Sequence, residues 1–195
     1  MGTAIVQNIP TKKPRKISLA TFLERYSNME DGFKYEYNQG IIEKTKTMNQ
    51  VQTAIFAVLL RAYINTLSFK NGGILTNETD MMTSLIQLRR PDIAIYSGIQ
   101  LSLMRKGENQ IAEWVAEVIS ESDNINRVNK KLDEYFDAGV KVVWHIFPEN
   151  ETVYVYTAAD EVQICRGEKI CSGAPAAADF EITAKAGNFG EVKKK

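Results

Sequence analysis

Residues 89–98 read RRPDIAIYSG, and residues 113–144 read EWVAEVISESDNINRVNKKLDEYFDAGVKVVW. Each segment contains an apolar run typical of a buried strand, with Asp92 at the start of the first run and Glu117 inside the second. A buried carboxylate is costly unless a cation neutralises it. Two such strands side by side would bring two carboxylates together, and the usual neutraliser of that arrangement is a hard divalent metal such as Mg²⁺. We therefore expect Asp92 and Glu117 to share a metal site.

The helix expected after the Glu117 strand brings a lysine toward the same place. It is predicted to begin at a Ser122 or Asp123 cap, to run to about residue 138 and to stop at Gly139. Successive helical residues turn by roughly 100°. Lys131 then falls at the border of the apolar face, whereas Lys130 points into solvent. The stem of Lys131 can lie along the sheet and bring its ammonium to the carboxylates.

The other periodic segments predict a mixed central sheet flanked by helices, in the α/β (α+β) class. Helices are expected at 19–26, capped by Ser18, and at 50–67, ended by Gly72-Gly73. A hairpin is expected around Asn38-Gln39-Gly40. Further strands are expected at 74–88, 92–96, 114–120, 141–147 and 152–156 (the last as an edge strand), and at 161–171 as a hairpin turning at Gly167.

The length and composition predict one globular domain at residues 17–190, with a flexible tail at 1–16 and a basic tail at 191–195. Lys and Arg number 24 against 24 Asp and Glu, which argues against a protein that holds nucleic acid mainly by its overall field. No apolar run spans a bilayer and no secretory signal is visible, so we expect a cytoplasmic protein with no membrane partner. Cys165 and Cys171 are then expected to be free thiols.

Two acids and a lysine in this arrangement predict phosphodiester hydrolysis. Asp92 and Glu117 would hold Mg²⁺ or Mn²⁺, helped by the Val118 carbonyl. The metal would polarise a phosphoryl oxygen and lower the pKa of a bound water. Lys131 would position or deprotonate that water and offset negative charge in the transition state.

The order Pro91-Asp92, Glu117 and a lysine resembles the PD-(D/E)xK nuclease superfamily, which has the restriction-endonuclease-like fold. The segments YEYNQGIIEK (35–44), RRPDIAIY, EWVAEVISESD, KLDEYFDAGVKVVWHIFPEN (131–150) and TVYVY (152–156) are more closely similar to the Uma-two family of predicted endonucleases, formerly a domain of unknown function. The resemblance implies a metal-dependent DNA endonuclease.

The chain departs from the family pattern at two positions, and a third position matches it. The superfamily lysine would stand at Ile119, and the resemblance places it at Lys131 on the helix instead. A histidine common near the start of the first long helix is Gln52 here. Glu36 matches a recurrent glutamate, which makes it a further candidate acid, although its place in a hairpin favours an exposed residue.

Other interpretations stay open for the same residues. Asp92 could be a solvated capping residue, Glu117 could be paired with a core Arg or Lys, and Lys131 could be solvated. His145, the only histidine, fits a hydrogen-bonded core residue better than a ligand. The function is then either a DNA endonuclease, plausibly a homodimer because one site cuts one strand, or a catalytically inactive relative that serves as a binding or assembly module.

Overall fold

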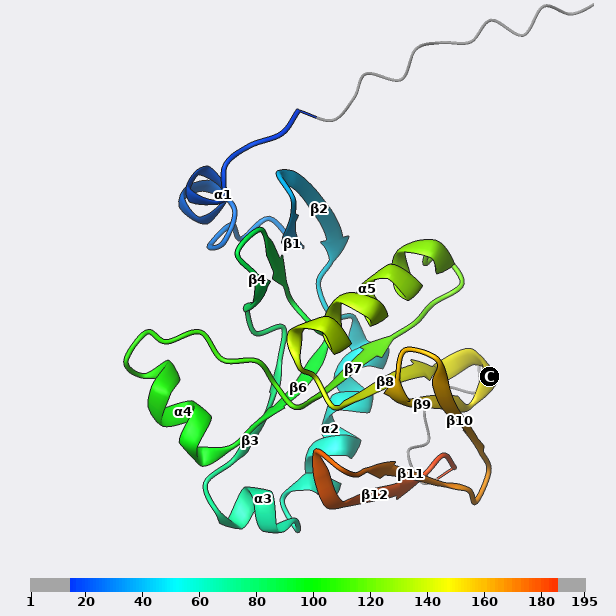
Figure 1. Cartoon of the computed structure of the whole chain (residues 1–195). Helices are drawn as coiled ribbons and strands as arrows, with labels where there is room; N and C mark the ends of the chain where they lie inside the picture. Colours follow the sequence, from blue (N-terminus) through cyan, green and yellow to red (C-terminus); the bar gives the residue numbers. More distant parts are fainter. Residues whose placement is uncertain (1–14, 186–195) are drawn as a thin grey trace, which may run out of the picture.

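A computed structural model describes residues 15–185 of the chain (Figure 1). Most of the predicted tail at 1–16 and all of the basic tail at 191–195 lie outside these residues. The first described residues already contact the N-terminal hairpin, since the Ile17 N–H donates to the Gly40 carbonyl at 2.9 Å. None of the helices within residues 15–185 has the length and hydropathy of a membrane span.

A six-stranded mixed sheet forms the centre of the fold. Across the sheet the strands are β10 (Glu161–Arg166), β9 (Thr152–Ala158), β8 (Val142–Phe147), β7 (Trp114–Val118), β6 (Ile93–Tyr96) and β3 (Ile74–Asn77). β7 and β8 are parallel and are connected by α5 (Ile125–Ala138), whereas the other neighbouring pairs are antiparallel. The predicted mixed sheet flanked by helices is confirmed.

The central sheet is covered on both faces, which explains why its inner strands are largely apolar, with Glu117 and His145 as exceptions. On one face α5 packs through Leu132 and Tyr135. On the other face lie α2 (Gln50–Tyr63) and a two-stranded sheet of β11 (Ile170–Gly173) and β12 (Ala177–Thr183). There Trp114, Trp144 and Phe180 are fully buried, with ring centroids 5.0–5.5 Å apart. Both tryptophans are therefore core residues.

A second sheet contains β2 (Ile41–Lys46), β1 (Phe33–Asn38), β5 (Gln87–Arg89) and β4 (Met81–Ser84), in that order. The predicted hairpin is confirmed: Gln39 and Gly40 both have positive φ, 51° and 91°, as two-residue hairpin turns favour. α1 (Leu19–Arg25) begins at the predicted Ser18 cap and packs on one face of this sheet through Phe22. The opposite face of the sheet is polar and meets α5.

The predicted boundaries of two helices need correction. α5 begins after Asn124, whose side chain accepts the Arg127 N–H, and not after Ser122 or Asp123. Asp123 accepts the Ser120 N–H instead. The left-handed Gly139 (φ 101°) ends α5 as predicted.

The helix predicted at 50–67 is two helices. α2 ends at Tyr63, and Thr66 caps the short α3 (Leu67–Lys70) because its hydroxyl accepts the Phe69 N–H. The short helix α4 (Gly98–Met104) follows β6. A 3₁₀ turn, η1 (Pro148–Asn150), links β8 to β9.

Strand pairing near the C-terminus also differs from the prediction. β9 is not an edge strand, because β10 pairs with it and forms the edge. β10 and β11 follow each other around Gly167 but do not pair, since β11 pairs with β12. Cys165 and Cys171 are buried free thiols, as expected.

Candidate functional site

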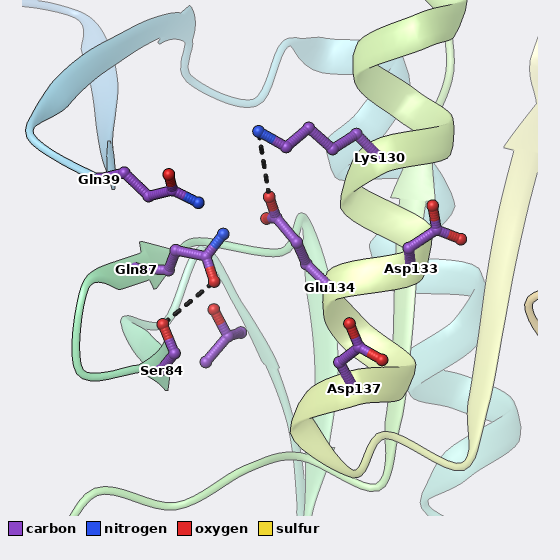
Figure 2. Close-up of a pocket in the computed structure, with 8 residues that line it drawn as sticks. Gln39, Ser84, Gln87, Lys130, Asp133, Glu134 and Asp137 are labelled. Atoms are coloured by element: carbon purple, nitrogen blue, oxygen red, sulfur yellow. Dashed lines mark hydrogen bonds and ion pairs between the residues drawn. The ribbon is translucent and has the colours of Figure 1, made fainter.

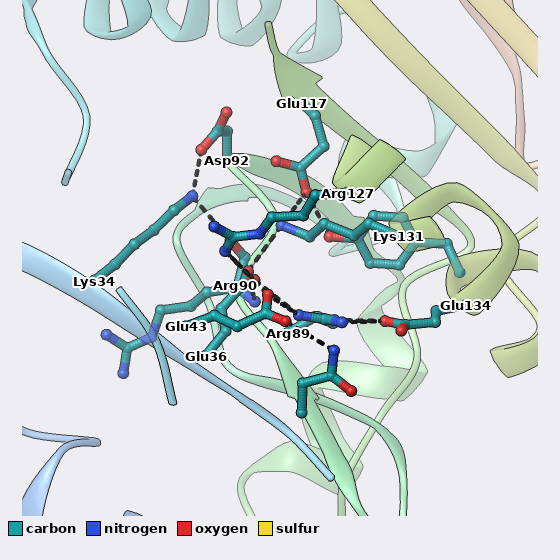
Figure 3. A network of polar contacts seen from close by, with 12 residues as sticks. Lys34, Glu36, Glu43, Arg89, Arg90, Asp92, Glu117, Arg127, Lys131 and Glu134 are labelled. Carbon is teal, nitrogen blue, oxygen red and sulfur yellow. Dashed lines mark hydrogen bonds and ion pairs between the residues drawn. The ribbon is translucent and has the colours of Figure 1, made fainter. Parts of the chain in front are cut away.

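Charged side chains from both sheets and from α5 meet in one buried network (Figure 3). It joins five carboxylates to four cations: Glu36, Glu43, Asp92, Glu117 and Glu134 with Lys34, Arg89, Arg127 and Lys131. The exposed Lys130 lies at its edge, 3.8 Å from Glu134. We call this set the charged network.

Asp92 stands directly before β6 and is 4% exposed. Its Oδ2 accepts the backbone N–H of Val118 at 2.8 Å, and its Oδ1 lies 2.5 Å from the Lys34 ammonium. The interpretation of Asp92 as a solvated capping residue is therefore wrong. Val118 does reach Asp92, but through its N–H; a role for its carbonyl in metal binding stays a prediction.

Glu117 lies in β7, and the antiparallel register places it opposite Asp92, because Ile93 pairs with Ala116. Its Oε1 accepts the Tyr135 hydroxyl at 2.5 Å and contacts the Lys131 ammonium at 2.8 Å. Its Oε2 makes no hydrogen bond to any residue from 15 to 185. The two acids predicted to converge are thus neighbours on adjacent strands, on the face covered by α5.

Lys131 extends from the flank of α5 as the helical periodicity predicts. Its side chain is 12% exposed, and its ammonium lies 2.8 Å from both Glu117 Oε1 and Glu36 Oε1. The side chain of Lys130 is 57% exposed. Of the two adjacent lysines, only Lys131 enters the site.

Glu36 is fully buried, so its interpretation as an exposed hairpin residue is wrong. In β1 it points away from the α1 side and toward α5, where Lys131 contacts Oε1 and Arg89 contacts Oε2. Arg89 is 2% exposed and also binds Glu43 at 2.8 Å and Glu134. Its guanidinium therefore holds three carboxylates that come from three different elements.

The two acids that share Lys131 have opposite pKa shifts. Burial alone would raise the pKa of Glu36, but Lys131, Lys34 and Arg89 hold it at about 2. The pKa of Glu117 is raised, first by burial and then by the negative charges of Asp92 and Glu36, although Lys131 opposes this. The cations around Glu117 thus do not fully offset the cost of its buried negative charge, and added positive charge beside it would be stabilising.

The cations that complete this network were not predicted from the sequence. Lys34, Arg89 and Arg127 come from segments with no charge pattern of their own. One signal was available: in β1 the polar residues Lys34 and Glu36 alternate with Tyr35 and Tyr37. In a strand that is covered on both faces, this alternation gives one buried face that is apolar and one that is polar.

Gln52 lies outside the charged network. Its side chain accepts the Asn49 N–H at 2.9 Å and the Asn49 side chain accepts the Gln52 N–H at 3.0 Å, which forms a capping box at the start of α2. In this chain the residue at the family's histidine position has a structural role.

His145 lies opposite Glu117 in the parallel β7–β8 pair and is 2% exposed. It is a core residue, as expected. Its ring packs edge-on against Tyr156 at 4.9 Å. The expected hydrogen bond is wrong for the described part of the chain, because the His145 side chain makes none within residues 15–185.

The imidazole of His145 should titrate far below the ordinary histidine range. Burial, helped by repulsion from Lys131, lowers the pKa of His145 from 6.5 to about 4. As the pH falls, His145 is protonated in the unfolded chain before it is protonated in the folded chain. The free energy of unfolding should therefore decrease as the pH falls from 6.5 toward 4. Because the chain has a single histidine, its NMR signals in EDTA report this pKa directly. A midpoint near 6.5 would contradict the buried, neutral ring.

Asp92 and Glu117 fit a small hard cation. Mg²⁺ is commonly held by one or two carboxylates, with water or phosphate oxygens completing its coordination. Two adjacent carboxylates, with a free Glu117 Oε2 and a raised Glu117 pKa, match that requirement. No three His, Cys, Asp or Glu side chains in the described part of the chain already surround a common point suitable for a metal. Asp92 and Glu117 would supply two ligands, and water or phosphate oxygens would supply the others.

A shallow groove of about 430 Å³ lies on the outer side of the network, between α5 and the loop of β4 and β5 (Figure 2). Glu134 borders both the groove and the network, and Lys130, Asp133 and Asp137 line the α5 side. Neither Asp92 nor Glu117 lines this groove, so it is separate from the paired acids.

Comparisons with known proteins bear on the fold and the family of the chain. A protein from Anabaena variabilis, described as a "putative nuclease belonging to DUF820", has a solved structure that matches with a TM-score of 0.74. The match is 19% identical and covers 88% of this chain and 97% of that one, which shows a shared fold. No curated protein matches the chain. The profile of the Uma2 family, described as "Putative restriction endonuclease", matches residues 19–185. The chain therefore belongs to the Uma2 family.

Proposed function

We propose that this protein is a metal-dependent endonuclease that hydrolyses phosphodiester bonds in DNA. The observation that carries the proposal is the placement of Asp92 and Glu117 opposite each other on β6 and β7, with the Lys131 ammonium 2.8 Å from Glu117. Membership of the Uma2 family and the nuclease-like fold support the same reaction class.

In this proposal Asp92 and Glu117 hold Mg²⁺ or Mn²⁺. When bound, the metal supplies Lewis-acid polarisation of the phosphoryl group and lowers the pKa of water. Two further residues, Tyr135 and Lys131, orient the carboxylate and offset negative charge. Tyr135 donates to Glu117 Oε1 and so fixes the orientation of that carboxylate. Lys131 is placed as a cation beside the same oxygen, where it offsets the negative charge that develops on the phosphoryl oxygens.

A plasmid-cleavage assay tests the proposal. Supercoiled DNA is incubated with the full chain and Mg²⁺, Mn²⁺, Ca²⁺ or EDTA. We expect nicked or linear product with Mg²⁺ or Mn²⁺ and none with EDTA. Cleavage that is equal in EDTA would contradict the metal-dependent mechanism.

Lys131→Ala is expected to slow cleavage by about 10²-fold or more while metal binding persists, because Lys131 acts on transition-state charge. Lys130→Ala is the matched control, since the neighbouring side chain is largely exposed. Single-turnover cleavage rates and a Mn²⁺ titration of each variant separate an effect on the cleavage step from an effect on metal binding. If Lys130→Ala produces the slowing instead, the assignment of the α5 face is wrong.

A second candidate function is a non-catalytic binding or assembly module. It is favoured by the extent to which the acids are already paired: Lys34 contacts Asp92, and Lys131 contacts both Glu117 and Glu36. In that case the network stabilises the fold, and no divalent ion binds between Asp92 and Glu117.

A further inference from the structure

Lys34 is a buried lysine to which the proposed mechanism gives no role. It lies in β1, is 5% exposed, and reaches the site from the second sheet. Its ammonium contacts Asp92 Oδ1 at 2.5 Å and the Arg90 carbonyl at 3.1 Å. A buried ammonium persists only where such partners offset its desolvation.

The charge of Lys34 acts on more than one acid. Burial opposes the ammonium form, and the negative charges of Asp92, Glu117 and Glu36 offset that cost. Figure 3 shows the lysine entering from the side opposite α5, so that Lys34 and Lys131 approach the paired acids from two directions. Lys34 therefore places a positive charge at the acids that are proposed to hold the metal.

A divalent ion and Lys34 compete for the same atom. Asp92 Oδ2 already accepts the Val118 N–H, whereas Oδ1 contacts the Lys34 ammonium. A metal that uses Oδ1 needs the space that the ammonium occupies, and two cations at contact distance repel each other. The other contact of Lys34 is with a neutral acceptor, the Arg90 carbonyl at 3.1 Å.

We propose that Lys34 is the cation that a divalent metal displaces from Asp92, and that it therefore sets the metal affinity of the site. This inference rests on the proposed function, in which Asp92 and Glu117 bind the metal. Lys34 is a positioning residue here: in the metal-free protein its ammonium holds the buried Asp92 carboxylate in place, and it makes metal binding weaker.

Isothermal titration of Mg²⁺ and Mn²⁺ into the full chain tests this role. Lys34→Met removes the competing charge, and we expect the Kd to fall at least about tenfold relative to the parent. Lys44→Met is the matched control: Lys44 is a lysine in the same hairpin, paired with Asp31 at 3.1 Å, but it is 45% exposed and outside the charged network. Its metal affinity should equal that of the parent.

Thermal denaturation of Lys34→Met and a second variant, Lys34→Gln, separate an effect on metal binding from an effect on folding. Lys34→Met leaves Asp92 buried without its cation, so its Tm without metal should fall and Mg²⁺ should raise its Tm by more than it raises that of the parent. Lys34→Gln keeps a hydrogen-bond donor for Asp92 while removing the charge, and it should also bind metal more tightly.

The outcomes separate the two proposals. Metal binding by the parent with unchanged or weaker affinity in Lys34→Gln would overturn the role of Lys34 and leave the proposed function intact. Absence of binding in the parent and in both Lys34 variants would contradict the proposed function itself. Tighter binding in the Lys34 variants, with Lys44→Met unchanged, is the result that the inference requires.

Discussion

Glu117→Gln is expected to abolish divalent-dependent cleavage of plasmid DNA, a loss of at least about a hundredfold. Glutamine keeps the shape of the side chain and an oxygen that can accept the Tyr135 hydroxyl, but it lacks the charge that a metal ligand needs. Because the pKa of Glu117 is raised by burial and by Asp92 and Glu36, its ionised form is less favourable in the folded than in the unfolded chain. The variant should therefore fold at least as stably as the parent.

Glu113→Gln is the matched control for this loss. Glu113 immediately precedes β7, is half-exposed and pairs with Lys141 at 2.9 Å. Circular dichroism should show native secondary structure in both variants, and only Glu117→Gln should lose cleavage. Full activity in Glu117→Gln would exclude the carboxylate as a metal ligand.

Arg89→Met is expected to lower the free energy of unfolding by about 3–5 kcal/mol, the usual cost of removing one partner of a buried ion pair. Arg89 is 2% exposed and holds Glu36, Glu43 and Glu134, which come from β1, β2 and α5. Without it these carboxylates stay buried with less positive charge around them. A loss of this size is a large part of the total stability of an ordinary domain.

Urea denaturation of the parent and Arg89→Met measures this change. Lys141→Met is the control, because its pair with Glu113 is half-exposed and should contribute less than about 1 kcal/mol. An Arg89→Met variant as stable as the control would show that the network carries no net stabilisation.

The site residues that were predicted are those marked by a pattern in the sequence immediately around them. An acid at or within an apolar strand segment marked Asp92 and Glu117, and helical periodicity placed Lys131 at the border of the buried face. Each of these signals lies within a few residues of the side chain concerned. The central mixed sheet and the first hairpin were predictable for the same reason.

The unpredicted part depends on contacts between distant segments. Lys34 and Asp92 are 58 residues apart, and Arg89 and Glu36 are 53 apart. They meet because β1 pairs with β5 and because this second sheet faces α5. No local pattern specifies that arrangement, so Lys34, Arg89 and Arg127 were not assigned to the site, and the polar alternation in β1 was the one local signal for Lys34.

The errors in pairing and capping have related causes. Gly167 does mark a turn, but β10 and β11 find better partners in β9 and β12. Three consecutive residues, Ser122, Asp123 and Asn124, are all good caps. The choice of Asn124 follows from a local turn in which Asp123 binds Ser120.

The account depends most on whether Asp92 and Glu117 bind one divalent ion together. Calorimetric titration of Mn²⁺ into the parent, Asp92→Asn and Glu117→Gln measures this directly. We predict one site per chain in the parent and no detectable binding at that site in either variant. Equal binding heats and affinities in all three proteins would contradict the shared site and, with it, the proposed nuclease mechanism.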